Sequence, residues 1–398
     1  MGHALAELSQ NAGTPAEVFR AFLRLGLTSF GGPIAHLGYF RAEFVERRRW
    51  LDERSFADIV GLCQFLPGPA SSQTGFALGL MRAGPAGALA AWAGFTLPSA
   101  VLMVLFAYGA PHLDATRWGA GLLHGLKLVA VAVVAQAVWG MARTLAPDRQ
   151  RASIAVAAVA LALFAPSSLG QVAAIALGAL LGLCFCREGA GAVPEPLRMP
   201  VSARAGAALL ALFAVLLALA FTPAGGFAGL AAAIYRSGAL VFGGGHVVLP
   251  LLRDAVVRPG FVGEAAFLSG YGAAQAVPGP LFTFAAFLGA TAAGVAGAVL
   301  ALAAIFLPGL LLLTGTLPFW DRLRGHPRMQ AALRGVNGAV VGLLGAALYD
   351  PVWTGSVRTA ADFTIALAAF VLLAAWKAAP VLVVGAAALL GTLLGAAA

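Results

Sequence analysis

The chain has 398 residues, of which 61% are hydrophobic and only 10% are charged, and its mean hydropathy is +0.90. A soluble domain carries roughly 25% charged residues, so this composition excludes an ordinary soluble protein and predicts a polytopic, all-α membrane protein. The net charge of +9 does not indicate a nucleic-acid partner, because basic residues of membrane proteins collect in cytoplasmic loops.

The first predicted element is a helix that ends in a glycine-rich break, Phe30-Gly31-Gly32-Pro33. The polar start, residues 1–16, lacks the pattern of a cleaved signal peptide. The rest of the first half then reads, in order, as a charged connection (41–54), a segment broken by Pro67-Gly68-Pro69 (56–81), a helix containing Leu97-Pro98, a helix containing Gly125-Leu126-Lys127, and two closing helices (153–165 and 172–186).

The second half repeats this series. Phe242-Gly243-Gly244 lies 212 residues after the first Phe-Gly-Gly, and Pro278-Gly279-Pro280 lies 211 residues after the first Pro-Gly-Pro. We therefore predict an N-terminal repeat (1–186), a linker with one unpaired helix (187–222), and a C-terminal repeat (223–398). An even number of crossings per repeat plus one extra helix would turn the second repeat upside down, which is inverted-topology pseudo-symmetry.

The loop charges favour re-entrant broken segments. If every segment spans the membrane, the largest basic cluster, around Arg47, faces outward. If the broken segments return to the side that they entered, the basic loop residues outside are Arg117, Arg253, Arg258 and Arg358, and all the others face the cytoplasm. The positive-inside rule favours this second arrangement, with nine full crossings and four broken or re-entrant elements.

The two Pro-Gly-Pro triplets are the strongest candidates for a transport site. Proline ends a helix because it lacks an N–H and clashes with the preceding turn, and a restarting half-helix points free N–H groups and a positive dipole end at an anion. A packing kink is the alternative reading for one copy, but two copies in register favour function. The predicted binding residues here are Gly31, Gly32, Gln64, Pro67, Gly68, Pro69, Ser71, Ser72, Gly243, Gly244, Gln275, Pro278, Gly279 and Pro280.

Basic residues within the apolar segments are further candidates. Arg24 and Arg236 occupy the same repeat position, six residues before each motif phenylalanine. They could bind an oxyanion through paired hydrogen bonds, or extend to the membrane interface instead. Lys127, which aligns with Asn337, is a weaker candidate for the same cationic pocket.

Three titratable residues are candidates for proton coupling: Asp58, His36 and His246. A helix cap is the favoured reading for Asp58, and a structural hydrogen bond is the favoured reading for the histidines. His36 aligns with Val248, so the two histidines form no symmetric pair.

No enzyme, metal site or cofactor is expected. The sequence has no P-loop, no His/Glu zinc pattern and no nucleophile elbow. Cys184 and Cys186 have no histidine nearby, so they read as apolar filling rather than metal ligands.

Four segments together resemble the chromate ion transporter family, namely 29–38, 64–73, 242–250 and 275–280. The resemblance covers nearly the whole chain and matches the long members with two repeats. It implies efflux of chromate across the cytoplasmic membrane, driven by the electrochemical gradient, with resistance to chromate and halves of opposite orientation.

The resulting hypothesis is a secondary transporter that exports an oxyanion, chromate first, from a site between the repeats. A sulfate or other tetrahedral oxyanion carrier, an anion channel and a membrane scaffold are the alternatives. The expected location is the inner membrane. The expected partners are the oxyanion and the lipid bilayer, with a homodimer as one option and no nucleic acid.

Overall fold

The structure, a computed structural model, describes residues 13–30, 32–165, 168–186, 201–242, 247–320 and 326–397. Over these ranges the chain forms helices and turns and no strand, which confirms the all-α fold. Five described stretches are long and apolar enough to cross a membrane: Ala70–Leu113, Arg117–Leu145, Ala203–Ala220, Leu281–Phe319 and Pro327–Ser356. With the shorter apolar helices, they confirm a polytopic membrane protein.

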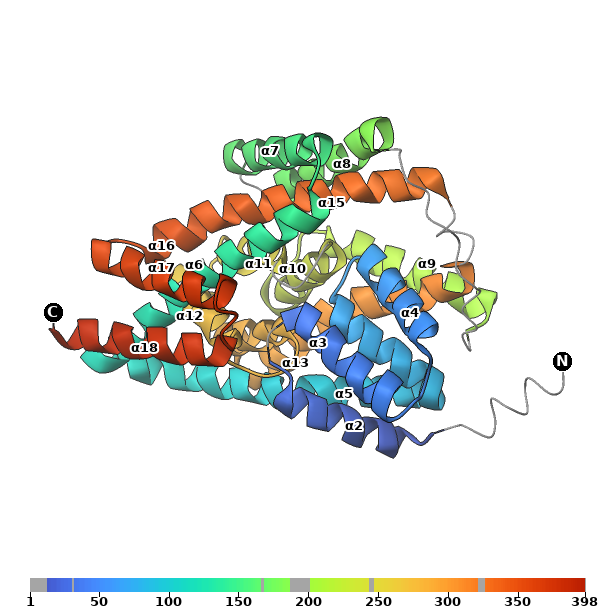
Figure 1. The fold of residues 1–398 in the computed structure, drawn as a ribbon, viewed down its shortest axis with the longest axis horizontal. Coiled ribbons are helices and arrows are strands. Elements are labelled where there is room, and N and C mark those ends of the chain that lie inside the picture. The colour runs from blue at the N-terminus through green and yellow to red at the C-terminus, as the bar shows by residue number, and fades with distance from the viewer. Residues whose placement is uncertain are drawn as a thin grey trace.

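The first repeat begins with α2 and ends with α8 (Figure 1). Its helices are α2 (Pro15–Thr28), α3 (Gly32–Phe40), α4 (Glu53–Phe65), α5 (Ala70–Asp114), α6 (Arg117–Leu145), α7 (Arg149–Phe164) and α8 (Ser168–Phe185), with a π-helical turn at Arg41–Arg47. α2 ends before the predicted break because Ser29 takes an extended conformation, and α3 restarts at Gly32, whose φ is +78°.

The second repeat follows α9 (Ala203–Ala220), the unpaired helix. It contains α10 (Gly226–Ala239), α11 (Val248–Val256), α12 (Glu264–Ala274), α13 (Phe284–Thr316), α15 (Pro327–Ala347), α16 (Thr354–Ser356), α17 (Ala360–Ala374) and α18 (Pro380–Ala397), with short turns at Leu281–Thr283, Leu317–Phe319 and Leu348–Trp353. The two repeats therefore present the same series of elements, as expected, while the exact domain limits remain a prediction.

Both repeats fold a half-helix back on the helix that follows it. α5 has non-helical backbone at Ala83 and Gly84, and α13 has nearly the same angles at Ala293 and Gly294. In a straight helix, Gly79 and Gly87 would lie about 12 Å apart, at 1.5 Å per residue. A Cβ at Gly79 would instead collide with the carbonyl oxygen of Gly87, so the chain reverses between them.

The repeats also exchange their closing helices. α6 packs against α17 and α18 of the second repeat, and its counterpart α15 packs against α7 and α8 of the first (Figure 1). Glycines allow these close contacts: a Cβ at Gly125 would collide with Ala387, and one at Gly335 with Gly178. The closing helices of each repeat therefore pack against the other repeat, so the two repeats are interlocked.

One ion pair shows the same symmetry at the surface. Arg41 binds Glu53 at 2.7 Å in the first repeat, and Arg253 binds Glu264 at 2.9 Å in the second. These four residues occupy equivalent positions, so the charged connections before α4 and α12 are held in the same way.

Candidate functional site

The first Pro-Gly-Pro turn is joined to the second repeat by a backbone hydrogen bond. Gly68, between α4 and α5, has φ +129°, a conformation that favours glycine. Its N–H donates to the carbonyl of Val241 at 2.7 Å. Val241 directly precedes the second Phe-Gly-Gly motif, so the two predicted motifs meet across the repeats.

The second Pro-Gly-Pro turn makes the equivalent bond in the opposite direction. Gly279 has φ +94°, and its N–H donates to the carbonyl of Ser29 at 2.9 Å. Ser29 directly precedes the first Phe-Gly-Gly motif and is the repeat counterpart of Val241. We call Gly68–Val241 and Gly279–Ser29 the reciprocal hydrogen bonds.

Each turn also rests on the proline-containing helix of the other repeat. A Cβ at Gly68 would lie 3.0 Å from the Cα of Gly309, and a Cβ at Gly279 would lie 3.0 Å from the Oγ of Ser99. Ser99 and Gly309 are themselves counterparts, each directly after a helix proline. The residues that follow the Leu-Pro pair of each repeat therefore contact the turn of the other repeat. We call the region where the two turns and these residues meet the crossing.

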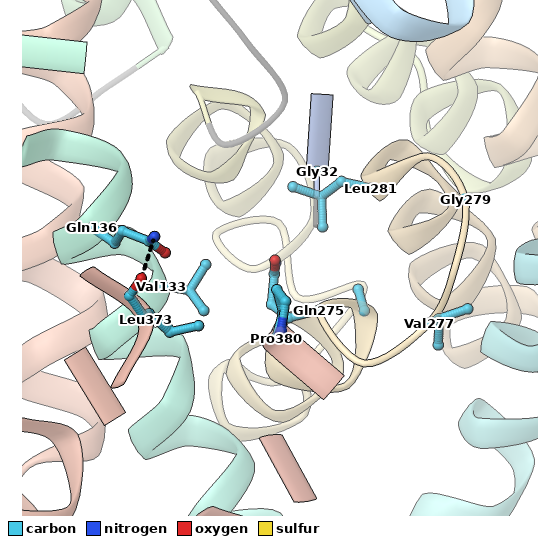
Figure 2. A pocket seen from close by; sticks show the side chains of 10 residues that line it. Gly32, Val133, Gln136, Gln275, Val277, Gly279, Leu281, Leu373 and Pro380 are labelled. Carbon is cyan, nitrogen blue, oxygen red and sulfur yellow. Dashed lines mark hydrogen bonds between the residues drawn. The ribbon is translucent and has the colours of Figure 1, made fainter. Parts of the chain in front are cut away.

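A small cavity of about 50 Å³ lies beside the second turn. It has room for a few water molecules or one small ion. Figure 2 shows Val133 and Gln136 of α6 on one side of it and Gly32, Gly279 and Leu281 on the other. The remaining lining residues are Ala274, Gln275, Val277, Leu373 and Pro380.

Two amides give this cavity its polar character. Gln275 lines it, with its Nε2 donating to the Tyr271 carbonyl at 3.5 Å. Gln136 donates to the Leu373 carbonyl at 3.2 Å, the bond drawn in Figure 2. Gln136 was not predicted, although a lone amide in the apolar stretch of α6 could have indicated it.

The start of α5 is far more polar than its counterpart. Ser71, Ser72, Gln73 and Thr74 are all buried. Gln73 holds the turn together, since its Nε2 donates to the carbonyls of Pro67 at 3.1 Å and Gly309 at 2.9 Å. The second repeat has Phe282, Thr283, Phe284 and Ala285 at these positions, so the first repeat offers more polar side chains beside its turn.

The symmetric arginines do not meet at the crossing. Arg24 is exposed on α2. Arg236 donates to the carbonyl of Ala220 at 2.8 Å and lies 5.5 Å from the ring centre of Phe221. Neither lines the cavity, so their binding role stays a prediction.

The other predicted residues differ in burial, and Gln275 is the one among them that lines the cavity. Gln64 is exposed, whereas its counterpart Gln275 lines the cavity. Lys127 is half-buried on α6, beside the place where Gly272 of α12 packs against Leu126. Among the prolines of the two turns, Pro69, Pro278 and Pro280 are buried and Pro67 is partly buried.

The three proton-coupling candidates differ in burial, and one of them is not described by the structure. His36 is buried on α3, with its Nδ1 3.4 Å from the Oγ of Ser71. Asp58 is partly buried on α4. The predicted residues Gly31, Gly243, Gly244 and His246 lie outside the described residues.

Within the described ranges, no group of three or more His, Cys, Asp or Glu side chains could hold a metal ion. The cysteines are free thiols, with Cys184 exposed.

These features define a helical membrane protein with two interlocked repeats and paired broken helices at their crossing. The chromate transporter family profile matches residues 16–183 and 228–392, so the chain belongs to the chromate transporter family. The matched ranges cover both repeats.

Curated relatives cover nearly the full length. The chain is similar to the chromate transport protein of Pseudomonas aeruginosa, with 30% identity over 91% of this chain and 87% of the relative. It is also similar to the chromate transport protein of Cupriavidus metallidurans, with 28% identity over 93% and 90%. A probable chromate transport protein of Synechococcus elongatus shares 26% identity over 89% and 88%. No solved structure matches the chain.

Proposed function

We propose that the protein is a secondary transporter that exports chromate, or a closely related oxyanion, across the inner membrane and thereby gives resistance to chromate. The observation that supports this most is the pair of reciprocal hydrogen bonds beside a small polar cavity. Broken helices at equivalent positions of two repeats are where secondary transporters bind substrate. The relatives named above are chromate transport proteins, which favours chromate over other anions.

The anion would lie at the crossing of the two turns. Its hydration would be replaced by backbone N–H groups at the restarting helices and by the amides of Gln136 and Gln275. A helix N-terminus carries roughly half a positive charge, which suits an anion. Ser71 and Ser72, at the start of α5, extend this donor-rich region in the first repeat.

Alternating access would come from rocking one repeat against the other. Because the two reciprocal hydrogen bonds are equivalent, loosening one while keeping the other opens the crossing towards one side. The exchanged helices keep the repeats joined during this motion.

Transport into inverted membrane vesicles tests the proposal. Labelled chromate should accumulate uphill when a pH gradient or membrane potential is imposed, and cells with the protein should survive higher chromate. Equal uptake of sulfate in competition would favour the general oxyanion carrier, and uptake that never exceeds equilibrium would indicate a channel. No uptake of either anion would overturn the proposed function.

The predicted arginines need their own test. A binding role for Arg24 and Arg236 predicts that Arg24→Gln and Arg236→Gln abolish resistance at normal protein levels. Gln275→Leu, which removes an amide from the cavity, should reduce uptake in the same assay. Full resistance in both arginine variants would remove the arginines from the site and leave the cavity as its centre.

A further inference from the structure

His36 is a buried histidine whose second ring nitrogen has no partner. The residue is 1% exposed, its Nδ1 lies near Ser71, and the ring meets Phe95 edge-on at 5.2 Å between centres. The Nε2 atom makes no hydrogen bond. Leaving a buried polar atom unpaired destabilises the folded protein, so the position calls for a reason.

Packing does not supply that reason. The counterpart of His36 in the second repeat is Val248, which is fully buried at 0% exposure. The same fold therefore accepts an aliphatic side chain of smaller size at this position. An imidazole kept in the first repeat alone points to a chemical role.

The histidine lies one helical turn from a residue that lines the cavity. Gly32, which lines the cavity, is four residues earlier in the same helix, and residues four apart share one helical face. The backbone of Ser29 is within hydrogen-bonding reach of the ring, and its carbonyl also accepts the N–H of Gly279. The His36 ring therefore lies close to Ser29, the residue through which the second repeat joins the first.

A dianion at the crossing needs positive charge. The ten lining residues named above carry no charged side chain, and an unpaired charge is costly to place in a low-dielectric interior. Helix N-termini contribute only partial charges. A protonated His36 would add one full positive charge within a helical turn of the cavity.

The charges near α3 are engaged elsewhere. α3 packs against α5 and the turn Arg41–Arg47. In that turn Arg47 pairs with Glu43, and Arg41 pairs with Glu46 and Glu53. The titratable groups of α5 are Arg82, which pairs with Glu17, and Tyr108, His112 and Asp114 towards its far end. The second-repeat segment 275–281 carries no titratable side chain.

We propose that His36 takes up a proton when the oxyanion binds and returns it to water when the oxyanion leaves. The inference rests on the proposed function. In this step the Nε2 lone pair of the neutral ring binds a proton from the aqueous phase, and the same N–H bond breaks on release, with no oxidation or reduction. Histidine suits this role because its ordinary pKa lies near neutral pH.

Proton uptake by the purified full-length protein tests this. Chromate or sulfate is added in a weakly buffered detergent solution with a pH indicator, and a protein-free blank is subtracted. Near neutral pH we expect up to about one proton taken up per anion bound by the wild type, and none by His36→Gln. His112→Gln, at an exposed histidine of α5, should behave as the wild type does.

The outcomes separate the two proposals. Failure of the wild type to bind or transport either anion would overturn the proposed function. Wild-type binding without proton uptake at any pH between 6 and 8, the range around the ordinary histidine pKa, would overturn the role of His36 alone. Equal uptake by His36→Gln would do the same. His36→Val, which copies Val248, should stay folded and lose the proton uptake, so a folding defect in His36→Gln leaves the test intact.

Discussion

The N–H of Gly68 donates to the carbonyl of Val241 across 2.7 Å, joining residues from opposite halves of the chain. The same bond recurs between Gly279 and Ser29. Two motifs that read along the sequence as neighbours within one repeat are therefore partners between repeats. The candidate site depends on this crossing, and the predictions below test it.

Alanine at either turn glycine should destabilise the protein. Gly279→Ala places a side chain at φ +94° and 3.0 Å from the Phe95 carbonyl, and strained backbone of this kind costs about 1–3 kcal/mol. Gly68→Ala should behave alike. Thermal unfolding in detergent measures the effect. Gly61→Ala, in α4 with open space around it, is the control and should be neutral or stabilising; equal unfolding temperatures for all three variants would contradict the prediction.

Gln73→Leu should loosen the first turn. Leucine is branched like the glutamine amide but apolar and one atom shorter, and it lacks the donor that bridges the carbonyls of Pro67 and Gly309. At about 1 kcal/mol for each lost bond, we expect a loss of about 2 kcal/mol. A lower unfolding temperature together with slower anion uptake is the expected result. An unchanged unfolding temperature would show that the bridge does not hold the turn.

If the two repeats have the inverted topology predicted from the sequence, their charged connections should be labelled from opposite sides of the membrane. Glu46 and Pro259 are exposed in the charged connections of the two repeats. In a Cys184→Ser background, Glu46→Cys should react with a membrane-impermeant maleimide from the cytoplasmic side only, and Pro259→Cys from the outside only. Labelling of both from one side would rule out the inverted arrangement.

The N-cap of α7 should show a pH-dependent effect in acid. Backbone and side-chain hydrogen bonds from Arg151 hold the pKa of Asp148 below its usual range. Its carboxylate therefore stabilises the fold fully above the ordinary pKa of about 3.9, and this stabilisation is lost as the pH falls through the lower folded value. The wild type should unfold at a higher temperature than Asp148→Asn at pH 7, and the difference should shrink below about pH 4. A difference that stays constant would contradict the assignment.

Sequence alone was sufficient for the repeats and for the breaks. Helix breakers that recur at one spacing within apolar stretches are a specific signal, and Gly68, Gly279 and Gly32 all have the positive φ that such breaks require. The exchange of α7–α8 and α17–α18 between the repeats was not predictable, because apolar helices facing lipid and those facing protein have similar composition.

The arginines and glutamines show where pseudo-symmetry misleads. Arg24 and Arg236 share a repeat position, yet their side chains have different surroundings. α2 is amphipathic, with Val18, Phe22 and Leu25 on its buried face and Arg24 exposed, and this pattern could have placed Arg24 away from the interior. Gln64 and Gln275 differ in exposure because α12 packs against α6, which encloses Gln275 and leaves its counterpart open.

The reciprocal hydrogen bonds also bear on what half of this chain could do. Each repeat supplies one donor glycine and one acceptor carbonyl, and neither pair can close within a single repeat. A polypeptide with one repeat would carry an unmatched turn and an unmatched carbonyl at positions that are buried in the two-repeat chain. It could satisfy both only by assembling with a second copy in the opposite orientation, so a single-repeat chain of this design is expected to work as an antiparallel pair.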